Sequence, residues 1–214
     1  MAFPIILSSP SGGGKTTIAH ELLRLRKDLG YSVSCTTRPP RDGEVEGRDY
    51  HFRSVADFER GQKAGEFAES AEVHGHLYGT LRKEVAKIIS SGKHVIMDID
   101  VQGAKQFAAA FPESVLVFIL PPSAEVLVER LASRGTESSK SLIRRFRSAK
   151  EELKAIDFYQ YVVVNDQIDS AVAEVNSIID AEHSRRSRNE SLEPLIAELE
   201  DGIQRAIDHY SERK

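Results

Sequence analysis

A glycine-rich stretch near the start of the chain, SSPSGGGKTT at residues 8–17, has the residue types of a phosphate-binding loop. Its glycines let consecutive backbone N–H groups face an anion, with no Cβ to keep the oxygens away. Lys15 can reach the β and γ phosphates of a nucleotide, and the Thr16 hydroxyl is a potential Mg²⁺ ligand. The stretch therefore predicts nucleoside triphosphate binding by Ser11, Gly12, Gly13, Gly14, Lys15, Thr16 and Thr17.

The loop departs from the strict pattern G-x-x-x-x-G-K-[ST] at its first position, where the chain has Ser9. That position only has to leave a strand and begin the turn, so another residue suffices if its dihedral angles are allowed. The alternative is a glycine-rich turn with an incidental lysine. An apolar run before the loop and an amphipathic helical pattern after it favour the phosphate-binding interpretation.

Acidic residues end a second apolar run, HVIMDID at residues 94–100. We expect Asp98 and Asp100 to share one side of a strand that lies beside the loop. The alternative is a strand end whose carboxylates only cap the backbone. Beside a phosphate loop, Asp98 is better suited to hold a magnesium-bound water than to abstract a proton.

The elements that must position these residues follow from hydrophobic periodicity. A helix is predicted from Thr17 to Leu29, with Ile18, Leu22, Leu25 and Leu29 on one stripe. Short apolar runs without alternating polarity predict strands covered on both faces. These runs are residues 4–7, 94–97, 115–120 and 161–164. Their alternation with helical stretches predicts an α/β fold, with a parallel sheet flanked by helices.

Composition narrows the function classes. The 214 residues are 40% hydrophobic and 29% charged with a net charge of −4, as in a soluble globular protein rather than a nucleic-acid binder. Cys35 is the single cysteine, which excludes an internal disulfide and fits a reducing compartment. The N-terminus has no signal-peptide pattern, and the longest apolar run, residues 115–120, is too short to span a membrane. We therefore expect a cytoplasmic protein without membrane or nucleic-acid partners.

Two charged regions interrupt the alternation. Residues 34–82 are expected to form an inserted subdomain of turns and short strands, and its arginines suit a second phosphate. Residues 126–156 are expected to be helical. Their Arg130 and Arg134 share one helical face, which suggests either a closing lid or a solvated surface paired with Glu129 or Glu137.

Six segments in order resemble the bacterial guanylate kinases, a family of P-loop nucleoside monophosphate kinases, from residue 5 to about residue 183. They are SPSGGGKTT, SVSCTTRPPRDGEVEGRDYHF, GEFAESAEVHGHLYGT, MDIDVQG, RGTE and VVVND. The resemblance implies Mg²⁺-assisted transfer of the γ-phosphoryl group of ATP to GMP or dGMP, without a covalent intermediate. It also implies a nucleotide-binding core of residues 1–33, 83–125 and 157–186, a GMP-binding subdomain of 34–82, and a lid of 126–156.

The resemblance also implies roles for single residues. The GMP phosphate would be bound by Arg38, Arg41, Tyr50 and Tyr78, and guanine by Ser34, Glu69, Thr80 and Asp100. Catalysis would use Lys15, Arg130, Arg134 and Arg145, with Asn165 on the adenine side and Mg²⁺ at Thr16 and, through water, Asp98. Glu69 is chemically apt because a carboxylate accepts from both N1–H and the exocyclic amine of guanine, and the hydroxyls of Ser34 and Thr80 can donate to O6.

Other functions remain possible at this point. A kinase for another nucleoside monophosphate is disfavoured by Glu69 and Thr80, and a peptide-binding scaffold of guanylate kinase type is disfavoured by the intact loop. Residues 187–214 are expected to form a helix with one apolar stripe. This stripe would contact a second subunit, giving a homodimer or larger oligomer, or pack back on the core. It comprises Leu192, Leu195, Ile196, Leu199, Ile203, Ile207 and Tyr210.

Overall fold

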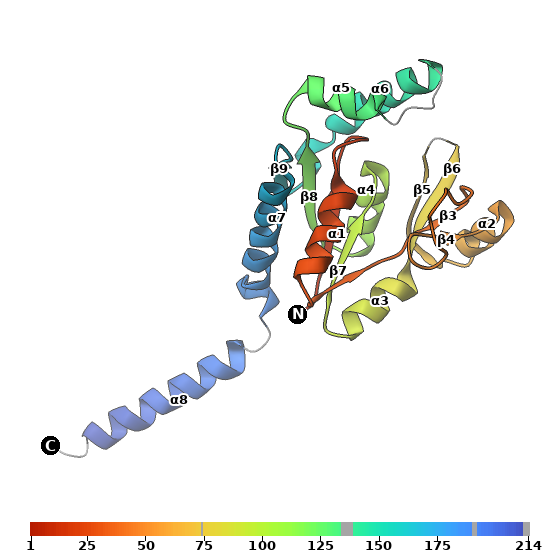
Figure 1. Ribbon diagram of the computed structural model, residues 1–214. Helices are drawn as coiled ribbons and strands as arrows, with labels where there is room; N and C mark the ends of the chain where they lie inside the picture. Colours follow the sequence, from red (N-terminus) through yellow and green to blue (C-terminus); the bar gives the residue numbers. More distant parts are fainter. Residues whose placement is uncertain (74, 134–138, 190–191, 212–214) are drawn as a thin grey trace. The chain divides into compact units, whose positions relative to one another are not determined.

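The computed structural model describes residues 1–73, 75–133, 139–189 and 192–211. These residues form two compact units. The larger unit comprises residues 2–177, and the smaller one comprises residues 178–214 together with Met1. Figure 1 shows the described helices and strands and labels most of them.

A five-stranded parallel sheet is the centre of the larger unit. Its order is β2 (Leu29–Tyr31), β7 (His94–Asp98), β1 (Pro4–Ser8), β8 (Val115–Leu120) and β9 (Tyr161–Val164). The four predicted strands are all present, and the expected fold class is confirmed. Apolar side chains of β1, β7 and β8 are buried, as their uninterrupted apolar sequences predicted.

The predicted helix over Thr17–Leu29 is wrong at its C-terminal end. Helix α1 (Lys15–Leu25) stops earlier, and Arg26 after it has an extended backbone. Leu25 is 56% exposed, whereas Leu29 is buried as the first residue of β2, the strand that the sequence analysis missed. Leu29 fits the helical stripe by spacing, but it lies in the sheet, where it pairs with His94 of β7.

Strand β9 also differs from the expectation that all four apolar runs are covered on both faces. In the part of the chain that the structure describes, it lies at the edge of the sheet and pairs with β8 alone. Val162 and Val164 are 41% and 51% exposed, while Val163 between them is fully buried. One face of this strand therefore lies outside the core.

A second sheet belongs to the inserted segment. Its order is β4 (His51–Phe52), β3 (Cys35–Thr36), β6 (His76–Leu81) and β5 (Phe67–Val73). The expected short strands are accompanied by α2 (Val55–Lys63), which the sequence analysis did not predict and which Ser54 caps. Cys35 is buried in a small core with Phe58 and Phe67, whose rings stack 4.4 Å apart.

Helix α4 (Val101–Ala110) connects the two sheets. Its Ala104 and Phe107 share one buried cluster with Ile6 of β1 and Ala68 of β5. Figure 1 shows α4 between β5 and the central sheet. The position of β5 relative to the central sheet is therefore set by direct packing against α4.

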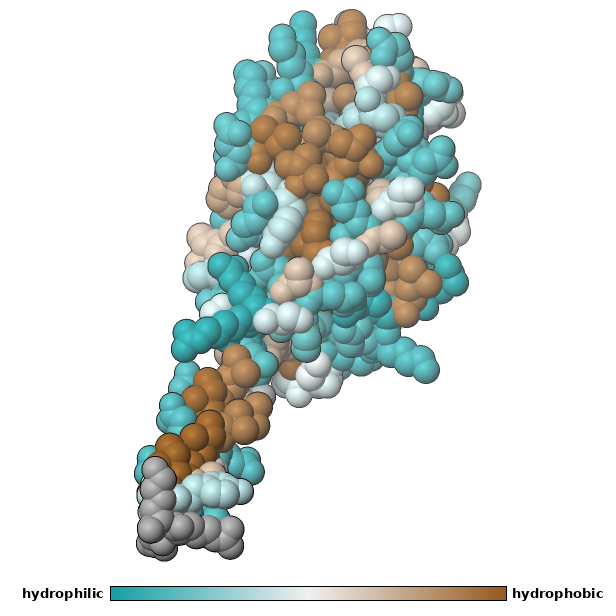
Figure 2. All heavy atoms as spheres, turned by 90° about the vertical axis from the view of Figure 1, so that its left-hand side faces the viewer, coloured by the Kyte–Doolittle hydropathy of each residue, from teal (hydrophilic) through white to brown (hydrophobic). Residues whose placement is uncertain are grey.

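The remaining helices complete the chain. They are α3 (Arg82–Ser90), α5 (Ala124–Ala132), α6 (Ser139–Leu153), α7 (Ile168–His183), α8 (Leu192–Ser211) and the short 3₁₀ segments Ile156–Phe158 and Arg186–Arg188. The predicted C-terminal helix is confirmed as α8, and Figure 2 shows apolar side chains gathered along it. Among the helices that the structure describes, none is long and apolar enough to cross a membrane.

Candidate active site

One cavity of about 500 Å³ in the larger unit is lined by both groups of predicted binding residues. From the phosphate loop it receives Gly12, Gly14, Lys15 and Thr16. The opposite group includes Ser34, Arg41, Tyr50, Glu69, Tyr78 and Asp100. The volume is in the usual range for small-molecule sites. Residues that are far apart in the sequence thus meet around one space.

The loop joins β1 to α1 with the backbone that its glycines permit. Gly12 and Gly14 have φ angles of 87° and 92°, a region that other residues rarely adopt. Gly14 precedes the first helical residue, Lys15, and no side-chain cap is found on this helix start in the described chain. Gly12, Gly14 and Lys15 line the cavity, so the positive end of the helix lies beside it, while the Gly13 N–H donates to the Pro10 carbonyl at 2.9 Å.

Ser9 fits the loop because Gly13 has no side chain. A Cβ on Gly13 would lie 2.6 Å from the Ser9 Cβ, far inside ordinary contact distance. The Ser9 hydroxyl donates to the carbonyl of Pro10 at 2.9 Å. The departure from the strict loop pattern is thus accommodated by the glycine at position 13.

Thr16 and Asp98 meet at the side of the loop. The Thr16 hydroxyl donates to Asp98 Oδ2, and the Tyr31 hydroxyl donates to Asp98 Oδ1 at 2.6 Å. Burial, together with the Asp98 charge, raises the pKa of Tyr31 far above its ordinary value, so this phenol stays a donor. The sequence analysis missed Tyr31 because it lies in the unpredicted strand β2.

Asp100 does not share a strand with Asp98, and this expectation is wrong. Strand β7 ends at Asp98, and Asp100 is the N-cap of α4. Its Oδ1 accepts from the backbone N–H groups of Gln102 at 2.7 Å and Gly103 at 2.9 Å. The two carboxylates therefore have separate settings, one at the loop and one at the start of α4.

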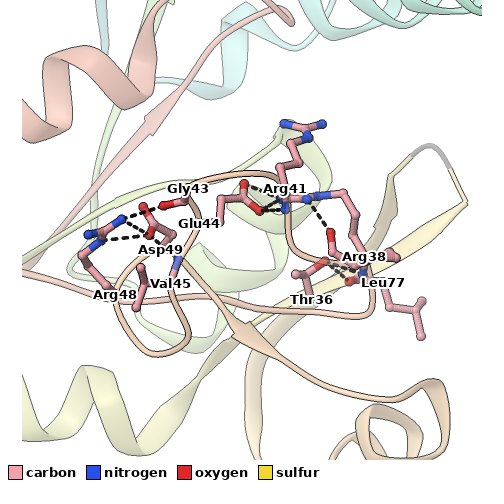
Figure 3. A network of polar contacts seen from close by, with 10 residues as sticks. Thr36, Arg38, Arg41, Gly43, Glu44, Val45, Arg48, Asp49 and Leu77 are labelled. Carbon is pink, nitrogen blue, oxygen red and sulfur yellow. Dashed lines mark hydrogen bonds and ion pairs between the residues drawn. The ribbon is translucent and has the colours of Figure 1, made fainter.

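A polar network joins the predicted acceptor-phosphate arginines to Glu44 (Figure 3). Arg38 Nη2 donates to both carboxylate oxygens of Glu44, at 2.7 and 2.9 Å. The backbone N–H of Arg41 donates to Glu44 Oε2 at 2.8 Å. Hydrogen bonds from Arg38 lower the pKa of Glu44, so the pair is charged. Glu44 lies close to both arginines in sequence, yet the sequence analysis gave it no role.

Aromatic hydroxyl residues flank this network. The rings of Tyr50 and Tyr78 lie 6.0 Å apart, and the Arg38 guanidinium is 5.4 Å from the Tyr50 ring centre. Burial, assisted by the charge of Asp98, raises the pKa of Tyr50 to about 12. Both tyrosines line the cavity, so their predicted contact with an acceptor phosphate is sterically open.

Glu69 is the buried carboxylate of the cavity, with 4% of its surface exposed. A shift in the strand register between Phe67 and Glu69 accompanies this inward position. Burial raises the pKa of Glu69 to about 7, although a hydrogen bond from Thr80 opposes the rise. Thr80 Oγ1 donates to Glu69 Oε1 at 2.7 Å, so its proton is directed at the carboxylate rather than at a base oxygen.

The predicted lid arginines have different settings. Arg130 Nη2 donates to the backbone oxygen of Asn165 at 3.3 Å. Arg145 is buried and donates to the carbonyl of Leu131 at 3.0 Å, so it ties α6 to the end of α5. Arg134 lies outside the described residues. Direct contact of these arginines with phosphate stays a prediction.

Side chains from distant segments also contact the loop. Asn165, expected on the adenine side, is buried and donates from Nδ2 to the carbonyl of Gly13 at 3.0 Å. Glu152 of α6 accepts from the Ser11 N–H at 3.0 Å, a contact that no sequence pattern indicated. One predicted nucleotide-binding N–H is therefore held by a carboxylate in this structure.

Comparisons with known proteins agree with this geometry. The family profile described as guanylate kinase matches residues 1–182. The guanylate kinase of Caldanaerobacter subterraneus subsp. tengcongensis is 47% identical over 194 residues, which is 91% of this chain and 94% of that protein. The guanylate kinase of Clostridium tetani is 46% identical over 184 residues, covering 86% and 88%.

A solved structure has the same fold. The crystal structure of guanylate kinase from Anaplasma phagocytophilum aligns with a TM-score of 0.76 and 34% identity, covering 91% of this chain and 93% of that one. The resemblance of the six sequence segments is thereby confirmed. By the extent of the profile match and the identity to these relatives, the chain belongs to the guanylate kinase family.

Proposed function

We propose that this chain transfers the γ-phosphoryl group of ATP to GMP, or to dGMP, giving ADP and GDP or dGDP by direct in-line transfer. The observation that carries the proposal is the single cavity lined by the phosphate loop on one side and by Arg41, Tyr50 and Glu69 on the other. Two phosphate-bearing substrates bound there would have their phosphates close together. Such positioning provides much of the rate in phosphoryl transfer.

On the donor side, the loop N–H groups and Lys15 would bind the β and γ phosphates of ATP. The Thr16 hydroxyl and the Asp98 carboxylate are in contact beside the loop, and oxygen ligands of this kind suit Mg²⁺. Thr16 would hold the ion directly and Asp98 through water, and the ion would neutralise phosphate charge. Tyr31 keeps the Asp98 carboxylate oriented for this role.

On the acceptor side, Arg38 and Arg41 would bind the GMP phosphate together with Tyr50 and Tyr78. The Arg38 guanidinium is already charged and desolvated against Glu44, so it is preorganised for a second anion. The acceptor is an ionised phosphate and requires no general base. Arg130, Arg134 and Arg145 would add positive charge as residues 126–156 close over the transferring group.

Three further assignments are proposed for the chain as a whole. The core, GMP-binding and lid segments would have the boundaries that the sequence analysis assigned to them. The apolar stripe of α8, whose described side chains from Leu195 to Tyr210 are 41% to 69% exposed, would pair with a second subunit. The single buried cysteine, Cys35, suits the reducing conditions of the cytoplasm.

An acceptor panel tests the proposed function. Formation of ADP from ATP would be measured with GMP, dGMP, AMP, UMP and IMP, with and without Mg²⁺. We expect GMP and dGMP to be phosphorylated efficiently only in the presence of Mg²⁺. Absence of ADP formation with every acceptor would favour a binding scaffold, and a preference for AMP or UMP would refute the guanine assignment.

A further inference from the structure

One face of helix α4 lies against the strand that carries Glu69. Gly103 and Gln106 are three residues apart on this helix and therefore share a face. A Cβ on Gly103 would lie 2.6 Å from Glu69 Oε2 and 3.1 Å from Glu69 Cδ. The carboxylate therefore occupies the space that any other residue at position 103 would fill.

Gln106 binds the next residue of the strand, Ser70, at both of its backbone groups. The Ser70 N–H donates to Gln106 Oε1 at 3.2 Å, and Gln106 Nε2 donates to the Ser70 carbonyl at 2.9 Å. Among the described residues, strand β5 is at the edge of its sheet and pairs with β6 on one side only. The Gln106 amide thus makes the two hydrogen bonds to the Ser70 backbone that a neighbouring strand would make at this open edge.

Gly103 also contacts the second acidic residue expected to read guanine. Its backbone N–H donates to Asp100 Oδ1 at 2.9 Å. The Glu69 carboxylate can therefore lie where it does because Gly103 has no side chain, and the Asp100 carboxylate is held by the backbone N–H of Gly103. Gly103 therefore contacts both carboxylates, that of Glu69 from strand β5 and that of Asp100 at the start of α4.

We propose that Gly103 and Gln106 are positioning residues for base selectivity, through which α4 holds the Glu69 carboxylate at a fixed position relative to Asp100. The inference rests on the proposed guanine-reading role of Glu69. Ala68 and Ala104, buried in the same cluster, fix the helix and strand at short distance. Selectivity is thereby built into the core helix as well as the inserted subdomain.

The size of the effect follows from the contact distance. Ordinary contact to a Cβ begins near 3.4 Å, so Gly103→Ala would displace the Glu69 carboxylate by about 0.8 Å or force α4 away from β5. Such a displacement weakens both hydrogen bonds to N1–H and the amine. We expect the KM for GMP to rise about 10- to 100-fold, while kcat changes less than threefold and the KM for ATP stays the same.

The experiment compares Gly103→Ala and Gln106→Leu with matched controls. Gly202→Ala places a new methyl group in helix α8 at an ordinary 3.7 Å from Arg205, and Gln102→Ala removes an exposed glutamine of α4. Each variant is assayed with GMP and IMP, because IMP lacks the amine. Both test variants should lower the ratio of kcat/KM for GMP to that for IMP, and both controls should leave it unchanged.

A double-mutant cycle separates positioning from general damage. In a Glu69→Gln background, Gly103→Ala should cost less than threefold further in kcat/KM for GMP, because the amide it displaces no longer accepts both hydrogen bonds from guanine. If Gly103→Ala does not fold, the cycle is made with Gln106→Leu. Full additivity, or an unchanged GMP to IMP ratio in both test variants, would overturn the inference.

The proposed guanine site has its own failure mode. If Glu69→Gln by itself leaves the GMP to IMP ratio unchanged, Glu69 does not read the base, and the inference fails together with that assignment. If Glu69→Gln lowers the ratio but the α4 variants do not, the guanine site stands and the positioning role alone is refuted.

Discussion

The buried carboxylate of Glu69 should couple base recognition to pH and to stability, and Glu69→Gln tests both effects. A carboxylate can accept from N1–H and the amine of guanine, whereas the amide turns one of its two groups into a donor. Hydrogen bonds to a charged acceptor contribute about 1.5–3 kcal/mol each. We therefore expect kcat/KM for GMP to fall at least ~10²-fold, with a smaller loss for IMP, which lacks the amine, and hardly any change in ATP affinity.

The effect on stability has the opposite sign. Burial raises the pKa of Glu69 from its ordinary value of 4.5 to about 7, so the folded chain binds the proton more tightly than the unfolded chain. The free energy of unfolding therefore falls as pH rises from about 4.5 to 7 and stays lower above that window. A pKa difference of this size corresponds to about 3 kcal/mol. Glutamine carries no charge at any pH and removes this loss.

Two measurements on the same samples check the reasoning. The free energy of unfolding is measured in urea at pH 5 and at pH 8. The difference between Glu69→Gln and the parent protein should shift in favour of the variant by up to about 3 kcal/mol from pH 5 to pH 8. The kcat/KM of the parent for GMP should decline as pH falls through about 7, because the protonated carboxyl accepts less well, and the variant should lack this decline. Thr80→Ser, which keeps the donor to Glu69, is the matched control.

One result would refute the argument as a whole. If Glu69→Gln loses stability equally at pH 5 and pH 8 and loses the same factor for GMP and IMP, the residue acts through packing. Burial of an ionised group would then not be the cause of either effect.

The other predictions concern the loop, the Asp98 setting and the C-terminal helix. Lys15→Ala should lower kcat about 10²- to 10³-fold without a change in Tm, and near-normal turnover would mean that the loop is misassigned. Tyr31→Phe removes the donor to Asp98 Oδ1 and should raise the Mg²⁺ concentration for half-maximal activity about 3- to 10-fold, at an unchanged KM for GMP. An unaltered Mg²⁺ dependence would contradict that role. A chain truncated after Asn189 should sediment with a smaller assembly mass than expected for the full-length oligomer, and the same number of subunits in both would exclude α8 as the subunit contact.

Much of the core could be predicted from the sequence because its signals are local. The four predicted strands are continuous apolar runs, and the loop is one contiguous segment between a strand and a helix. Strand β2 was not predicted because it has only three residues, Leu29–Tyr31. Its central residue, Gly30, is a glycine because of a contact with a segment that is distant in the sequence. A Cβ on Gly30 would lie 2.5 Å from Ile88 Cγ2 of α3, and nothing near position 30 in the sequence reveals that contact.

The candidate site shows the same division. Lys15, Glu69 and the arginines were identified by residue type and by resemblance, and most of them line the cavity or its polar network. Their partners were not identified. Tyr31 reaches Asp98 across 67 positions, and Glu152 reaches Ser11 across 141. Such pairs are created by the packing of elements and have no spacing signature in one sequence.

The close fit of Ser9 against Gly13 has an evolutionary consequence. The two positions do not vary independently, because the Ser9 side chain occupies the space that a Cβ at position 13 would need. A substitution at Gly13 would therefore first require position 9 to become glycine, and its Cβ would still lie a tight 3.1 Å from the Pro10 carbonyl oxygen. The reverse path, in which a loop with glycine at position 9 acquires serine, is free as long as Gly13 is kept. The residue at position 9 thus limits which substitutions position 13 can accept.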